Sequence, residues 1–387
     1  MKRVMILLSL LSTGAMAQKI DVNKQFALAG QQYQRMLADH PDTSKTIHSA
    51  KPDGTYRDLP SSWWCSGFFP GSLWYLYEKT KDVKWEKSAR LWTAAVEKEQ
   101  FNKGTHDLGF MMFDSFGNEL RLTKDPHAKK VLIQSAKSLA SRFDPKIGLI
   151  KSWNTFKGGF TYPVIIDNMM NLELLFWASR ETGDQTFHNI AITHADNTIK
   201  NHFRSDYSSY HVICYDENGK VLVKKQHQGY QDESTWSRGH AWAIYGYVTM
   251  YRETKDKKYL DFAQKITDFY LNHPNLPADK IPYWDFSAPN IPNEERDASA
   301  GAITASALLE LSTYSGAKGK RYYADAVKML ESLSSPAYRA ALGENNNFLI
   351  KHCVGAKGLN SEIDVPLVYA DYYYLEGLLR YQKHNKK

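Results

Sequence analysis

Two aspartates stand where apolar helices are predicted to begin. Asp167 follows an extended apolar run at residues 162–166 and precedes a helical stretch, and Asp107 lies directly before the apolar segment 108–112. An isolated aspartate at such a junction most often caps the helix. Paired carboxylic acids are also the usual apparatus of glycoside hydrolysis, in which they flank the bond that is broken. On spacing alone, capping is the simpler interpretation.

The side chains around Asp167 favour chemistry over capping, because a cap needs no surrounding Met, Trp or Tyr. Apolar surroundings and a second carboxylate favour the protonated form of an acid, which suits a proton donor near neutral pH. The positive end of a helix dipole favours the charged form instead. The sequence does not show whether the apolar surroundings or the helix dipole has the larger effect on the protonation of Asp167. We predict that Asp107 and Asp167 are the catalytic acids.

The densest cluster of polar and aromatic residues lies between Gln228 and Trp242. A helix that begins near residue 234 places Trp236 beside His240 and also places Arg238 beside Trp242. The simpler interpretation is an amphipathic helix with a buried tryptophan and a surface arginine. The functional one, which we favour, is an aromatic platform beside a guanidinium that can hold a carboxylate, with Gln228 ordering a hydroxyl or a water.

Two further candidates lie outside this cluster. Trp64 belongs to an aromatic loop at residues 63–71, which we place at the rim of a binding face. Taken alone, such a residue more often packs a core or a loop than contacts a sugar. His211 lies in a predicted hairpin and is interpreted as structural until a partner is found.

A repeated turn motif indicates which elements position these residues. The motif occurs at Thr80-Lys81-Asp82, Thr182-Gly183-Asp184 and Thr254-Lys255-Asp256, with related versions at Ser315 and Thr123. In the three full copies an aromatic residue follows the Thr by five positions and an alanine by nine. This pattern predicts a tight turn between two helices, with the Asp capping the outgoing helix.

The turns and the apolar periodicity together predict twelve helices, which begin near residues 20, 68, 83, 108, 125, 167, 184, 234, 256, 298, 319 and 366. The hairpins are unequally spaced, which favours a closed all-α (α/α)6 barrel over an open solenoid. Long insertions then gather at one mouth as the binding face. One insertion, around residues 211–223, predicts a small β-hairpin. We expect a single domain over residues 18–387.

The first 17 residues have the pattern of a secretory signal peptide, with Lys2 and Arg3 before a short apolar run. We therefore expect an exported, periplasmic protein without a membrane anchor, since no later stretch reaches the roughly 20 apolar residues of a membrane span. Removal of the peptide lowers the net charge from +7 to +5. This excess is small and not clustered, so nucleic acid is not an expected partner.

The remaining patterns mainly exclude other chemistries. Cys65, Cys214 and Cys353 are odd in number and lack C-x-x-C spacing, so they are predicted to be buried thiols. The sequence contains no G-x-S-x-G, P-loop, H-E-x-x-H or G-x-G-x-x-G motif. A serine triad, a nucleotide site and a zincin are therefore disfavoured.

The motifs together resemble a known family, the unsaturated glucuronyl hydrolases of glycoside hydrolase family 88. The matching patterns are W-x-x-G-F at Trp64, H-D-x-G-F at His106, D-x-M-M-N at Asp167, Y-H-V at Tyr210 and Q-G-Y at Gln228, followed by S-T-W-x-R-G-x-A-W at Ser234. They cover nearly the whole mature chain in order. The resemblance implies an (α/α)6 barrel that needs no metal or organic cofactor.

The resemblance also implies a substrate and residue roles. The substrate is a short oligosaccharide with a 4,5-unsaturated uronic acid at its non-reducing end, most simply a glycosaminoglycan fragment. Asp167 protonates C4 and helps activate the water that adds at C5, and Asp107 holds ring hydroxyls and influences the proton affinity of Asp167. The matching pocket positions are Trp64, His211, Gln228, Trp236, Arg238 and Trp242. His240 departs from the glutamine of many relatives, which leaves fine substrate preference open.

Other functions remain possible on the sequence. An unsaturated rhamnogalacturonyl hydrolase would have the same fold and chemistry on pectin fragments. A toroidal polysaccharide lyase would need a Tyr/His pair instead, and a non-catalytic protein would only bind sugar. Lys357 and Ser361, in a polar loop before the last helix, are either sulfate contacts or plain surface residues. We expect a monomer whose partner is the unsaturated oligosaccharide, with no nucleic acid partner and no membrane anchor.

Overall fold

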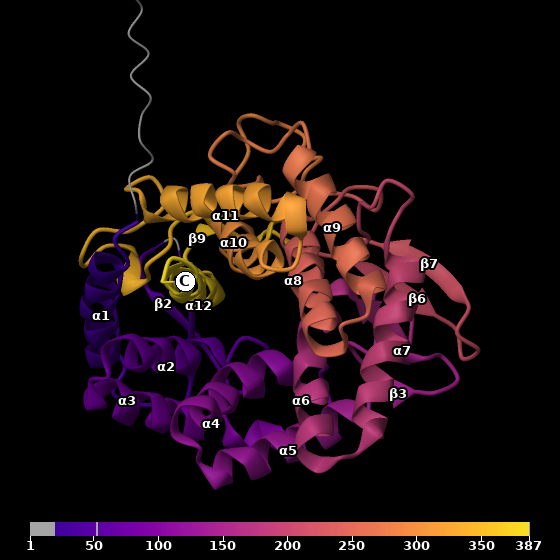
Figure 1. The fold of residues 1–387 in the computed structure, drawn as a ribbon, viewed down its shortest axis with the longest axis horizontal. Helices are drawn as coiled ribbons and strands as arrows, with labels where there is room; N and C mark the ends of the chain where they lie inside the picture. The colour runs from indigo at the N-terminus through magenta and orange to yellow at the C-terminus, as the bar shows by residue number, and fades with distance from the viewer. Residues whose placement is uncertain (1–19, 52, 387) are drawn as a thin grey trace, which may run out of the picture.

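The computed structural model describes residues 20–51 and 53–386, and its helices form a closed ring (Figure 1). The inner helices, which surround the centre of the ring, are α2 (Phe68–Thr80), α4 (Asn118–Thr123), α6 (Leu172–Thr182), α8 (Ser237–Thr254), α10 (Ala298–Ser312) and α12 (Val368–His384). The outer helices are α1 (Val22–Asp39), α3 (Val83–Ala94), α5 (Pro126–Ala140), α7 (Gln185–His202), α9 (Lys257–Asn272) and α11 (Gly319–Ser334). The predicted (α/α)6 barrel is confirmed.

The turn motif makes the helical hairpins as predicted. Asp82, Asp184 and Asp256 each accept a hydrogen bond from the backbone N–H two residues later, at 3.0, 2.9 and 2.9 Å. The residue before the Asp has a left-handed backbone conformation, with φ of 59° at Lys81 and 77° at Gly183. The left-handed residue ends the inner helix, and the Asp satisfies an N–H group that the outer helix leaves free.

Two inner helices do not begin as α-helices. The sequence predicted helix starts near residues 108 and 167, but a π-helix, η2 (Gly109–Gly117), precedes α4, and a 3-10 helix, η3 (Ile166–Asn171), precedes α6. A π-helix is rare and often occurs at a functional site, whereas a 3-10 turn at the start of a helix is common. Other 3-10 turns are η1 (Glu97–Phe101), η4 (Gly316–Lys318), η5 (Asn345–Asn347) and η6 (Lys357–Leu359).

The predicted hairpin is present as β6 (Val212–Tyr215) and β7 (Val221–Lys225). The extended run before Asp167 is also a strand, β5 (Pro163–Ile165), which pairs antiparallel with β6. The Ile166 N–H continues this pairing by donating to the His211 carbonyl oxygen at 3.0 Å. The sheet therefore places the residue before Asp167 directly beside His211.

Three two-stranded pairs were not predicted from the sequence. They are β1 (Thr46–Ala50) with β2 (Tyr56–Leu59), β3 (Phe143–Asp144) with β4 (Leu149–Ile150), and β8 (Cys353–Ala356) with β9 (Ser361–Val365). Each lies in a connection between helices. The predicted signal peptide, residues 1–17, lies outside the described residues. Among the helices that are described, none has both the length and the apolar character needed to cross a bilayer.

Gly67 allows the start of α2 to approach the backbone of η2. A Cβ at this position would lie 2.2 Å from Phe110 O and 2.3 Å from Met111 O. Because these are backbone atoms that cannot easily move, Gly67→Ala should lower the free energy of unfolding by about 1–3 kcal/mol, measured by urea denaturation. The control Gly30→Ala meets only the Trp85 ring, at 3.4 Å, and should be neutral or stabilising. Equal losses in both variants would contradict this explanation.

Candidate active site

The two acids belong to segments that pack directly against each other. Asp107 lies two residues before η2, and Asp167 lies in η3. The Phe110 N–H donates to Asn171 Oδ1 at 3.1 Å, and a Cβ on Gly109 would lie only 2.5 Å from the Asn171 Cα. Glycine is therefore required for this approach, which brings the two acid-bearing segments to the same end of the ring.

His106 lies within the electrostatic field of both acids. Its Nε2 is 3.2 Å from Asp107 Oδ1, and its side chain is buried. Burial lowers the pKa of His106, while the charges of Asp107 and Asp167 act in the opposite direction. Burial also raises the pKa of Asp107, and the nearby Asp167 adds to that effect, against His106 and a hydrogen bond donated by the Thr105 hydroxyl. Asp167 is thus close enough to influence the protonation of Asp107.

His211 has the partner that the sequence could not identify. Its Nε2 lies 3.5 Å from Asp167 Oδ2, an ion-pair distance, and both atoms are buried without a hydrogen-bond partner among the described residues. The Gln228 N–H donates to His211 Nδ1 at 3.3 Å, so a neutral ring has its proton on Nε2, facing Asp167. The ring also packs on Trp236, with 4.5 Å between ring centroids.

Arg238 is buried, which excludes the surface position of the simpler interpretation. Its Nη1 lies 2.8 Å from Asp297 Oδ2, and its guanidinium also donates to the carbonyl oxygens of Val354 and Gly355. The guanidinium carbon lies 4.6 Å from the centre of the Trp236 ring. The carboxylate that Arg238 holds in this structure is therefore the protein's own, and the side chain ties α8 to α10 and β8.

The two remaining tryptophans differ in exposure. Trp242 is fully buried, with its ring centroid 5.0 Å from that of Phe110. Trp64 is half-buried and packs 5.4 Å from Phe110 and 5.1 Å from Tyr369. Trp64 is thus the tryptophan of this pair with a surface free to stack on a sugar ring, whereas Trp242 is enclosed and packs against Phe110.

A loop from the C-terminal part of the chain borders the site. The Gln228 side chain donates to the Gly355 carbonyl oxygen at 3.2 Å, and a Cβ on Gly358 would lie 2.7 Å from Gly229 O. Lys357, in the same loop, has its Nζ 2.6 Å from Glu294 Oε2 and also contacts Glu295. A ligand sulfate would have to compete with these two carboxylates for Lys357.

Sequence reasoning missed several residues of this site. His106 stood in a matched motif but received no role, and Asp297 gave no sign that it would meet Arg238 across 59 positions of chain. The sequence also did not indicate the contacts of His48. The Cys65 Sγ lies 2.8 Å from His48 Nδ1, and Glu362 contacts the same imidazole. The adjacency of His106 to Asp107 was the one signal available beforehand.

All three cysteines are free and buried, as predicted. Within residues 20–51 and 53–386, no three His, Cys, Asp or Glu side chains are grouped so as to hold a metal ion. What the fold provides at this mouth is a pair of buried acids with histidines and aromatic rings around them. Such a toroid with paired acids is suited to the processing of glycans.

Comparison with known proteins gives the family. The profile of Glycosyl Hydrolase Family 88 matches residues 41–386, and the chain belongs to this family. It is therefore a glycoside hydrolase. An unsaturated glucuronyl hydrolase from Formosa agariphila is 45% identical over 367 residues, which cover 94% of this chain and 91% of that protein.

Solved structures agree in fold over nearly the whole length. The crystal structure of an unsaturated glucuronyl hydrolase specific for heparin has a TM-score of 0.91 and 48% identity, and covers 95% of this chain and 98% of its own. A mutant of the Streptococcus agalactiae unsaturated glucuronyl hydrolase, complexed with dGlcA-GalNAc6S, has a TM-score of 0.80 and 28% identity, with coverage of 96% and 94%.

The buried pair of Arg238 and Asp297 should contribute strongly to stability. Arg238→Ala leaves the Asp297 carboxylate buried without its partner, so the free energy of unfolding should fall by about 3–5 kcal/mol in urea denaturation. The control Arg180→Ala removes a more exposed arginine that pairs with Glu253, and its effect should stay within about 1 kcal/mol. A small loss in Arg238→Ala, together with a raised KM, would assign Arg238 to substrate binding instead.

His240 gives the fold a dependence on pH. Its Nε2 contacts the Ile266 carbonyl oxygen at 2.8 Å and its Nδ1 contacts the Ser209 hydroxyl at 3.1 Å, an arrangement that suits a neutral ring. Burial lowers the pKa of His240 to about 4. An unfolded histidine has a pKa of about 6.5, so the unfolded chain takes up the proton first and stability falls as the pH drops from about 6.5 toward 4.

Replacing His240 by Gln should flatten this dependence. His240→Gln removes the titrating group, so the loss of stability between pH 6.5 and about 4 should become smaller, as measured by thermal unfolding across that range. His188→Gln, at a half-buried histidine of the outer helix α7, serves as the control. An unchanged pH profile in His240→Gln would show that other groups cause the dependence.

Proposed function

We propose that this hydrolase removes a 4,5-unsaturated uronic acid from the non-reducing end of glycosaminoglycan fragments made by polysaccharide lyases. The observation that supports it most directly is the buried Oδ2 of Asp167, which has no hydrogen-bond partner among the described residues and faces His211 at 3.5 Å. The similar proteins support the substrate class, since one is specific for heparin and another was crystallised with dGlcA-GalNAc6S.

The proposed reaction is a hydration of the C4=C5 double bond. Asp167 gives its proton to C4, and the positive charge that develops at C5 is shared with the ring oxygen. Water adds at C5 while the Asp167 carboxylate takes a proton from it, so the acid is regenerated. The product is a hemiketal, which opens and releases the next sugar. Because a carbon receives the proton, the usual relation between carboxylate separation and stereochemistry does not apply.

The neighbouring residues orient the reactants in this scheme. Asp107, fixed by Thr105 and flanked by His106, accepts hydrogen bonds from ring hydroxyls and influences the proton affinity of Asp167. His211 orients the Asp167 carboxyl group. The other pocket positions, by our proposal, are Trp64, Gln228, Trp236, Arg238 and Trp242, with Arg238 acting through Trp236 and Gly355 rather than by a free guanidinium.

We also propose that the protein is exported to the periplasm and acts there as a monomer. The charged and apolar pattern of the first 17 residues supports export. Fractionation of the native cells and light scattering of the purified protein test the two statements separately.

The absorbance of the alkene distinguishes the possible functions. Purified protein is incubated with unsaturated chondroitin, heparin and hyaluronan disaccharides and with unsaturated rhamnogalacturonan disaccharide. Loss of ultraviolet absorbance with the first three supports the proposal, and loss with only the last identifies a rhamnogalacturonyl hydrolase. A rise in absorbance with intact polysaccharide would identify a lyase, and no change would leave only sugar binding.

Asp167→Asn should abolish turnover while the affinity for the disaccharide is retained, because the amide keeps the shape but supplies no proton. The expected loss in kcat is at least about 10²–10⁴-fold. Asp184→Asn, at an outer helix cap, is the matched control and should keep its activity. Activity near that of the unmodified protein in Asp167→Asn would refute the proposed role.

A further inference from the structure

A cavity of 1140 Å³ opens at the end of the ring opposite the acids. Most of its lining comes from the second and later turns of the inner helices, including Tyr75 of α2, Trp177 of α6 and Tyr245 of α8. A layer of packed rings separates it from the acids, with Trp242 lying 5.0 Å from Phe110 and 5.4 Å from Tyr373. We call it the rear cavity, and it is large enough for an oligosaccharide.

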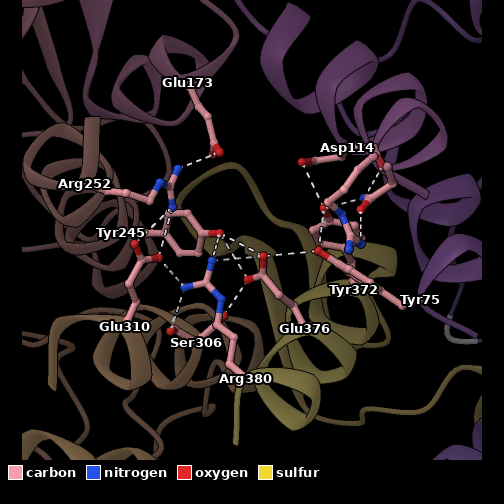
Figure 2. A network of polar contacts seen from close by, with 12 residues as sticks. Tyr75, Asp114, Glu173, Tyr245, Arg252, Ser306, Glu310, Tyr372, Glu376 and Arg380 are labelled. Atoms are coloured by element: carbon pink, nitrogen blue, oxygen red, sulfur yellow. Dashed lines mark hydrogen bonds and ion pairs between the residues drawn. The ribbon is translucent and has the colours of Figure 1, made fainter. Parts of the chain in front are cut away.

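The floor of the rear cavity is a network of hydroxyl and carboxyl groups (Figure 2). The Tyr372 hydroxyl donates to Asp114 Oδ1 at 3.1 Å, and the Tyr75 hydroxyl lies 3.0 Å from Tyr372 and 3.2 Å from Glu376. The second oxygen of Asp114 is buried and has no hydrogen-bond partner in the described part of the chain. The floor can therefore exchange hydrogen bonds with a polyhydroxylated ligand.

The charges around the cavity leave a cationic excess. Four of its acids are neutralised by ion pairs, which are Glu78 with Arg121, Glu181 with Lys129, Glu173 with Arg252, and Glu376 with Arg380. Burial and the neighbouring Glu376 raise the pKa of the fifth, Asp114, which favours its neutral form. Among the residues that the structure describes, Lys79, Lys124 and Lys383 pair with no carboxylate. An anionic ligand would be attracted here.

The wall supplies aromatic surface. Trp177 and Phe113 line the cavity with their ring centroids 6.1 Å apart. Aromatic walls, a hydrogen-bonding floor and unpaired lysines at the rim are together the chemistry that recognises an acidic saccharide. We propose that the rear cavity is a second, non-catalytic binding site for an acidic oligosaccharide that bears carboxylate or sulfate groups.

This site does not depend on the proposed reaction, because none of its lining residues is among the catalytic acids or the predicted pocket positions. A saturated chondroitin 6-sulfate tetrasaccharide, which has no alkene to hydrate, is therefore the suitable probe. Binding is followed by tryptophan fluorescence, since Trp177 lies in the wall. We expect a saturable change in fluorescence that is lost in Trp177→Phe.

The lysines provide the decisive comparison. Lys124→Gln combined with Lys383→Gln should weaken binding of the probe about three- to tenfold without changing the rate on an unsaturated disaccharide. Lys130→Gln combined with Lys320→Gln makes the same change of charge on outer helices and should leave binding unchanged. A Trp177-dependent signal that is weakened by the Lys124→Gln, Lys383→Gln variant would place the bound ligand in the rear cavity.

Three results would overturn the proposal. The first is the absence of a Trp177-dependent signal with the tetrasaccharide. The second is equal weakening by both lysine pairs, which indicates only non-specific charge attraction. The third is a signal that does not require an acidic saccharide, whether neutral chitotetraose binds as tightly as the acidic probe or inorganic sulfate alone reproduces the full signal. Failure of the disaccharide assay alone would refute the proposed function and leave this site intact.

Discussion

The contact between η2 and η3 is the constraint on which the candidate active site depends. Asp107 precedes η2 by two residues, and Asp167 lies in η3. The two helices meet where Gly109 approaches the backbone of Asn171 and where the Phe110 N–H donates to the Asn171 side chain. A side chain at Gly109 would push the segments apart. Because an acid must lie close to the atom that it protonates, this close packing would set the geometry of the proposed protonation.

Burial changes the pKa values of Asp107 and His106 and leaves some polar atoms near the acids without partners. Near the acids, buried polar atoms of Asp167, His106 and His211 lack hydrogen-bond partners among the described residues. Such atoms destabilise a fold, and they are tolerated where a ligand can satisfy them. The same burial raises the pKa of Asp107 and lowers that of His106. The ring of helices, tied by the buried pair of Arg238 and Asp297, holds these groups in place.

The direction of the inner helices divides the molecule into two ends. The irregular starts of the inner helices gather the acids, histidines and the loop around Lys357 at one mouth. The later turns gather tyrosines and paired arginines around the rear cavity (Figure 2). Unpaired lysines also line this cavity. Aromatic rings fill the space between, so the two ends share one core but differ in chemistry.

The sequence by itself determined the helical hairpins, the ring, the β6–β7 hairpin and the positions of the two acids, because periodicity, capping residues and turn motifs act over a few neighbouring positions. Only the tertiary structure decided that Asp167 contacts His211, that Arg238 forms an ion pair with Asp297, and that Lys357 forms ion pairs with two glutamates. It also decided that η2 is a π-helix and that a cavity opens behind the aromatic layer. These features arise from packing between residues far apart in the chain, and local sequence patterns contain no information on which distant side chains will meet.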